Sequence, residues 1–196
     1  MRKKQIDLFF RQLDQEIACR ATIILVGASA GTLMGHIRPS VDIDFEIRAR
    51  YSKYANRLAL EAKIQKVAKN LGIAVNFSED ISHWSMVSYL DYRKTARFYH
   101  QFGKLKVKLI APEYWTIGKM ARFYELDIQD MIRIIRKKRL HAQKLVLLWR
   151  EAMKTSDLSL ELGQFKDHVI YFLRTYSRKL WGKNLDVDKT IRLFLK

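Results

Sequence analysis

Two aspartates separated by one residue, Asp42 and Asp44, are the strongest candidates for chemistry in the sequence. They fall in a segment, residues 41 to 47, in which apolar and acidic residues alternate strictly. Because successive side chains of a strand point to opposite faces, this pattern predicts a half-buried strand with both carboxylates on one face. The carboxylates would repel each other, and a bound divalent cation relieves that repulsion. The alternative is an ordinary solvated strand face, which shows the same alternation.

A turn of small residues precedes this strand and favours the metal site. Gly27, Ala28 and Ser29 follow a buried apolar run, residues 21 to 26, and lead into a short predicted helix, residues 28 to 34. Glycine permits a close backbone approach, and free N–H groups at a helix start can bind phosphate oxygens. No Gly-Lys-Ser/Thr follows, so the turn is not a P-loop, and it lacks the Gly-x-Gly-x-x-Gly dinucleotide pattern.

A second segment carries two cations followed by two acids. Lys119 and Arg122 share one face of a predicted helix, residues 113 to 126, away from its apolar stripe. Two cations on one face suit a triphosphate, although a solvated basic face shows the same spacing. Asp127 and Asp130 follow, and the alternative role for Asp127 is the N-cap of the next helix, with Asp130 favouring its positive end.

Together these segments resemble the signature of the polymerase β nucleotidyltransferase superfamily: a strand, the small-residue turn, a short helix and an Asp-Ile-Asp strand. Within it, the run Arg38-x-Ser40-x-Asp42-Ile-Asp44 is similar to the form found in the AbiEii and MenT toxin group and its uncharacterised relatives. The pair Lys119 and Arg122, followed by Asp-x-x-Asp, resembles a later helical motif of the same group. The resemblance covers residues 21 to about 135.

The resemblance implies an α+β nucleotidyltransferase fold, with a mixed β-sheet flanked by helices and followed by a helical C-terminal region. It implies transfer of a nucleoside monophosphate from an NTP to a hydroxyl of RNA, tRNA included, or of protein. Asp42 and Asp44 would hold Mg²⁺ or Mn²⁺ and act in catalysis with Asp127. The residues implied in nucleotide binding are Gly27, Ala28, Ser29, Arg38, Ser40, Lys119 and Arg122. A toxin role beside a cognate antitoxin is also implied.

One segment departs from the superfamily's pattern. Its members usually place a third carboxylate on a neighbouring strand as general base, whereas the expected strand here reads Lys106-Val-Lys108. Glu46, on the same strand face as the aspartate pair, and Asp127 are the candidate substitutes. The alternative function is therefore a catalytically inactive nucleotidyltransferase fold that binds nucleic acid.

Composition points to a polyanionic partner. The chain has 37 Lys and Arg against 20 Asp and Glu, a net charge of +17 and a pI near 10.0, which favours nucleic acid through counterion release. Residues 131 to 150 hold seven Lys or Arg and no acid, a pattern that indicates a basic helical wall for RNA or a solvated helix face.

The 196 residues suffice for a core domain with a helical appendage. We expect a nucleotidyltransferase core over residues 1 to 112 and a helical region, residues 113 to 196, packed on it. The single cysteine, Cys19, excludes an internal disulfide and favours a cytoplasmic location. No apolar run reaches the roughly 18 residues of a membrane span, so no membrane partner is expected. The histidines, His36 among them, show no zinc-ligand spacing.

Hydrophobic periodicity and turn residues give the expected elements. Helices are predicted over residues 5 to 17, 28 to 34, 52 to 71, 113 to 126, 128 to 140, 142 to 153 and 162 to 181, and from 188 onward. Strands are predicted over residues 21 to 26, 41 to 47, 73 to 77, 86 to 90, 96 to 99 and 105 to 110.

Overall fold

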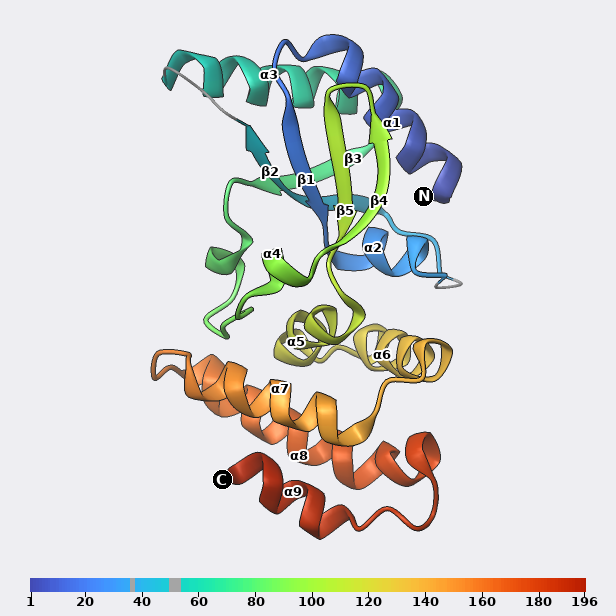
Figure 1. Cartoon of the computed structure of the whole chain (residues 1–196), viewed down its shortest axis with the longest axis vertical. Coiled ribbons are helices and arrows are strands. Elements are labelled where there is room, and N and C mark those ends of the chain that lie inside the picture. The colour runs from blue at the N-terminus through green and yellow to red at the C-terminus, as the bar shows by residue number, and fades with distance from the viewer. Residues whose placement is uncertain (36–37, 50–53) are drawn as a thin grey trace. The chain divides into compact units, whose positions relative to one another are not determined.

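A computed structural model describes residues 1–35, 38–49 and 54–196 (Figure 1). His36 and the first two residues of the helix predicted from residue 52 lie outside the described residues. The chain divides into two compact units. Unit 1 consists of Met1–Ile81 and Arg93–Ile110, and unit 2 of Ser82–Tyr92 and Ala111–Lys196. Residues 82–92, which the sequence assigned to the core, group with the later helices.

Unit 1 is built on a five-stranded sheet in the order β3-β2-β1-β5-β4. Its strands are β1 (Ala21–Leu25), β2 (Asp42–Ala49), β3 (Ala74–Ser78), β4 (Arg97–Phe102) and β5 (Leu105–Leu109). The pairs β1–β2 and β4–β5 are antiparallel, whereas β1–β5 and β2–β3 are parallel. The prediction of an α+β fold with a mixed sheet is therefore confirmed.

The alternation of β2 separates an apolar face from a polar one. Ile43, Phe45 and Ile47 are at most 2% exposed, while Asp42 and Asp44 are half-buried on the opposite face. This arrangement confirms the half-buried strand predicted for residues 41 to 47. A slip of one residue would bury both carboxylates in the core, so the apolar residues fix the face on which the acids lie.

The core of unit 1 forms where helices pack on the apolar face of the sheet. Its helices are α1 (Lys3–Glu16), α2 (Gly27–Leu33) and α3 (Tyr54–Leu71). The ring of Phe10 in α1 lies 5.9 Å from that of Phe45 in β2 and 6.0 Å from that of Phe102 in β4. Helices α1 and α3 pack on each other (Figure 1).

Unit 2 is helical. Its main helices are α5 (Pro112–Arg122), α6 (Glu125–Lys138), α7 (Ala142–Lys154), α8 (Leu160–Trp181) and α9 (Val187–Leu195). Two short helices lie near its junctions with unit 1, η1 (Ile81–Trp84) and α4 (Tyr92–Thr95). Inside the unit the fully buried Trp149 of α7 donates from Nε1 to the hydroxyl of Thr116 in α5 at 2.9 Å. Within the described ranges no helix is long and apolar enough to cross a membrane.

Two predictions about elements were wrong. Residues 86 to 90, predicted as a strand, form irregular backbone in which Leu90 has a left-handed φ of 53°. Val87 there is fully buried, so the apolar character of the run reflects burial without strand pairing. The helix predicted over residues 113 to 126 ends at Arg122, because Phe123 adopts a left-handed φ of 56° and caps it.

Replacing Phe10 by Ala should lower the free energy of unfolding of unit 1 by about 3–5 kcal/mol, because the substitution leaves a cavity among buried rings. The matched control is Phe98→Ala, since Phe98 of β4 is 61% exposed and its loss should cost less than about 1 kcal/mol. Urea unfolding followed by circular dichroism measures both. Equal losses would contradict this packing of α1 on the sheet.

Candidate functional site

The carboxylates of Asp42 and Asp44 are joined by one side chain from the neighbouring strand. Asn76 of β3 lies opposite Asp44 in the parallel pairing of β2 and β3. Its Nδ2 atom donates to Oδ2 of Asp42 at 3.2 Å and to Oδ1 of Asp44 at 2.9 Å. The amide hydrogens thus offset part of the repulsion between the acids.

Asn76 was not predicted from the sequence. The signal that would have identified it is strand pairing: residues 73 to 77 were correctly predicted as a strand, but its partner was not assigned. The sequence prediction expected the third acid on the strand that carries Lys106 and Lys108. That strand is β5, which is not adjacent to β2, because β1 lies between them. The position beside Asp44 on the adjacent strand therefore holds an amide.

The glycine turn lies directly against Asp44. Gly27 begins α2 with a left-handed φ of 56°, and a Cβ atom built on it would be 1.8 Å from Oδ2 of Asp44. The N–H of Val26, the residue before it, donates to the backbone carbonyl of Asp44 at 2.9 Å. Only glycine permits this approach, so the turn and the carboxylate pair form one structural unit, as the sequence suggested.

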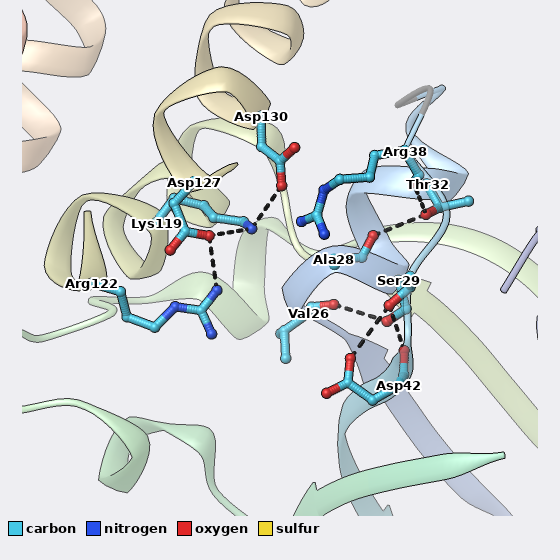
Figure 2. Close-up of polar contacts among 11 residues, drawn as sticks. Val26, Ala28, Ser29, Thr32, Arg38, Asp42, Lys119, Arg122, Asp127 and Asp130 are labelled. Carbon is cyan, nitrogen blue, oxygen red and sulfur yellow. Dashed lines mark hydrogen bonds and ion pairs between the residues drawn. The ribbon is translucent and has the colours of Figure 1, made fainter. Parts of the chain in front are cut away.

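The other residues predicted from the turn and from the start of β2 hold the local backbone in place (Figure 2). The buried hydroxyl of Ser29 donates to the carbonyl of Val26 at 3.1 Å. Ser40, also buried, donates to the carbonyl of Asp42 at 2.6 Å. The hydroxyl of Thr32 lies 3.1 Å from the carbonyls of both Ala28 and Arg38. The predicted contacts of these residues with phosphate stay predictions.

Glu46, a candidate substitute for the missing acid, is held by other groups. Its side chain is fully buried, and Arg93 donates to its two oxygens at 2.8 and 2.9 Å. The backbone N–H of Ile81 adds a third donor at 3.3 Å. A carboxylate whose oxygens are occupied in this way is a structural ion pair, because removing its partner would leave a buried charge.

In unit 2 the predicted cations and acids form a buried ionic cluster of their own (Figure 2). Lys119 Nζ lies 2.6 Å from Oδ1 of Asp127 and 2.9 Å from Oδ2 of Asp130. Arg122 Nη2 is 3.0 Å from the same Asp127 oxygen. Trp115 covers Lys119 with its ring centroid 5.1 Å away. Two cations thus balance two acids, and the cluster ties α5 to α6.

Asp127 does not cap α6, because the helix begins at Glu125 and Tyr124 is its N-cap residue. Its Oδ2 atom is buried and has no hydrogen-bond partner among the described residues. Lys119 is 1% exposed and shared between the two acids, whereas the side chain of Arg122 is 55% exposed. Arg122 is therefore the more accessible of the two cations predicted to bind phosphate.

The aspartate pair could hold a magnesium or manganese ion together with water and substrate oxygens. Among the described residues no group of three or more His, Cys, Asp or Glu is placed to hold a metal. Mg²⁺, however, is commonly bound by one or two carboxylates that are completed by waters and substrate phosphates. One oxygen of Asp42 and one of Asp44 lie within 3.2 Å of a single Asn76 nitrogen. If the amide turned over, its carbonyl oxygen would supply a further oxygen ligand.

No protein-family model, no curated protein and no solved structure matches the chain.

Replacing Gly27 by Ala should destabilise the protein more than replacing Gly72 by Ala. Both glycines have a left-handed φ, 56° and 63°, but a Cβ at Gly72 meets nothing within 4 Å whereas one at Gly27 meets Asp44. The Gly72 variant should lose about 1 kcal/mol from backbone strain, and the Gly27 variant more than that. Thermal unfolding of both variants measures the difference. Equal losses would show that the turn does not press on Asp44.

Replacing Asn76 by Asp should make stability depend on divalent cations, because it places a third carboxylate beside two others. Without metal the variant should have a lower Tm than the parent. Millimolar Mg²⁺ should raise its Tm by more than it raises that of the parent, since binding to the folded state stabilises it. The control is Asn76→Ala, which removes the amide without adding charge. An Asp variant insensitive to Mg²⁺ and Mn²⁺ would contradict the metal site.

Proposed function

We propose that this protein is a metal-dependent nucleotidyltransferase of the polymerase β type, which transfers a nucleoside monophosphate from an NTP to a hydroxyl of RNA or protein. The observation that carries the proposal is the aspartate pair of β2, which Asn76 bridges and of which Asp44 lies directly against the turn at Gly27. A solvated strand face does not require two adjacent carboxylates or the close approach of one of them, Asp44, to a backbone that only glycine allows.

The proposed reaction uses a divalent cation, the aspartate pair and the phosphates of the substrate. When bound, a divalent cation neutralises the triphosphate and orients the attacking and leaving oxygens. Asp42 and Asp44 would hold the cation, and Ser40 keeps Asp42 in position through its hydrogen bond to the Asp42 carbonyl. The acceptor oxygen forms a bond to the α-phosphorus, the bond from that phosphorus to the bridging oxygen breaks, and pyrophosphate leaves. The hydroxyl proton passes to solvent or to a base.

The resemblance adds Lys119 and Arg122 as ligands of the triphosphate. In unit 2 both cations already contact Asp127, so a phosphate bound by either one would have to share it with, or take it from, that carboxylate. Arg122 is the better candidate because of its exposure, and its planar guanidinium can bind two phosphate oxygens at once. The toxin role and the antitoxin partner rest on the resemblance alone.

A second candidate is a catalytically inactive nucleotidyltransferase fold that binds nucleic acid. Two observations favour it: the position beside Asp44 holds the amide of Asn76, which is not a base, and Glu46 is locked by Arg93. For this candidate we expect that the aspartate pair either binds Mg·NTP or binds no nucleotide, and that no nucleotide is transferred from an NTP to an acceptor.

Replacing Asp42 or Asp44 by Asn should weaken Mg²⁺-dependent NTP binding by about 100-fold or more, because groups that only support a metal ligand already contribute 10–100-fold. Isothermal titration calorimetry measures the affinity, and circular dichroism verifies the fold. The matched control is Asp157→Asn, an exposed carboxylate of unit 2, which should bind as the parent does. If both site variants bind Mg·NTP as tightly as the parent, the metal site is misplaced.

A further inference from the structure

The face of the sheet that carries Asp42 and Asp44 continues into a basic groove. The groove has a volume of about 930 Å³, and the cations that line it are Arg20, Arg48, Arg93, Lys104, Lys106 and Lys108. Strand pairing accounts for their gathering: Thr22 of β1 lies between Arg48 of β2 and Lys106 of β5. Side chains in register on adjacent strands share a face. All the lining residues belong to unit 1.

Four of these cations have no counter-charge in the described part of the chain. Within it, no hydrogen bond or ion pair engages the side chains of Arg20, Arg48, Lys106 and Lys108. The other two are engaged: Arg93 pairs with Glu46, and Lys104 Nζ donates to the carbonyl of Ile17 at 2.6 Å.

The gathering of these charges costs free energy. Arg48 and Lys106 flank Thr22 from the two adjacent strands, so their backbones are about 10 Å apart, two strand spacings. Like charges at that separation on one surface repel, and a bound polyanion would remove the repulsion. No carboxylate is among the described residues that line the groove, so this lining attracts anions.

The aspartate pair is not among the described residues that line the groove, but Arg48, which lines it, lies on the same strand as the pair. Asp44 and Arg48 are four residues apart on β2 and project from the same face, a separation of about 13 Å at 3.3 Å per residue. One phosphate occurs about every 3.4 Å along a stacked nucleic-acid strand, so the separation corresponds to roughly four nucleotides. A strand bound at Arg48 and extended along β2 by about four nucleotides would reach the carboxylates.

The lining favours recognition of charge over recognition of bases. Among the described residues its apolar members are Ala21, Ile24 and Ala49, and none of these described members has an aromatic ring. Bases that are read by a single-strand binding surface stack on aromatic side chains, and the described lining of this groove contains none. Arginines and lysines without partners bind phosphate oxygens, arginine with a two-pronged geometry.

We propose that this groove binds the phosphate backbone of a single-stranded RNA and that this RNA is the acceptor of the transferred nucleotide. The second clause rests on the proposed function, whereas RNA binding requires only the groove. The surface differs from the one predicted from the sequence, residues 131 to 150, which belongs to unit 2. Recognition is electrostatic and independent of base sequence.

The test compares two double variants with the same loss of charge. One replaces Arg48 and Lys106 by Gln in the groove. The other replaces Arg11 and Lys69 by Gln, two exposed residues on α1 and α3, which pack on the opposite face of the sheet. The probe is a fluorescein-labelled single-stranded RNA of about twelve nucleotides and mixed sequence, within known single-strand site sizes. Fluorescence anisotropy gives the Kd of the full-length protein over a range of salt concentrations.

For the parent, log affinity should fall against log salt with a slope of about −3, because four contacted phosphates contribute about 0.7 each. The slope of the groove variant should be shallower by about 1.4, because two phosphate contacts are lost. Its affinity at low salt should be at least tenfold weaker. The control variant should keep the parent's slope. The proposal is overturned if the groove variant loses no more RNA affinity than the control variant. It is also overturned if RNA affinity falls only in a third variant, Arg136→Gln with Lys138→Gln on α6.

Two further measurements distinguish an RNA site from a site for an acidic protein, and the groove from the proposed nucleotidyltransferase activity. If the parent binds polyglutamate but not RNA, the groove is a site for an acidic protein and the proposal fails. Calorimetry with Mg·NTP separates the groove from the proposed function. A parent that binds RNA through the groove but binds no Mg·NTP would support the groove and contradict the nucleotidyltransferase.

Discussion

The alternation of β2 is the constraint on which the rest of unit 1 depends. Burial of Ile43, Phe45 and Ile47 against α1 and neighbouring rings fixes the register of the strand, so Asp42 and Asp44 must face the other way. The aspartates then lie side by side, and their repulsion must be offset by Asn76 and, in the proposed enzyme, by a cation. The tight turn at Gly27 follows from the same register, since any side chain there would meet Asp44.

The polar face of the sheet separates negative from positive charge along one strand. At one end of β2 the aspartate pair is suited to a cation, and at the other end Arg48 joins cations from β5 that are suited to phosphates. Glu46, which lies between them on β2, is paired with Arg93. The surface charge therefore changes from negative to positive within a few residues of this strand. This polarity suits a reaction in which a phosphate chain is held at one end while a triphosphate is activated at the other.

Much of the local structure followed from sequence because periodicity reports burial directly. The strands at residues 21 to 26 and 41 to 47 were predicted this way, and so were the helices after residue 112, apart from the end of α5 at Arg122. The common face of the aspartate pair and the turn beside it were predicted as well. Contacts that depend on strand order could not be predicted. Asn76 lies beside Asp44 because β3 pairs with β2. The basic groove forms because β1 pairs with both β2 and β5. Residues 86 to 90 were misassigned because apolar composition does not distinguish a strand from buried irregular chain.

The most direct test of the central claim is transfer of label from an NTP to an acceptor. The parent and the Asp42→Asn variant are each incubated with Mg²⁺, total cellular RNA and one of the four NTPs labelled at the α-phosphate, and in parallel at the γ-phosphate. A nucleotidyltransferase attaches the α-label to an acceptor and releases the γ-label as pyrophosphate, and the variant does neither. Binding of Mg·NTP and RNA without transfer of α-label from any NTP would contradict the account and favour the inactive fold.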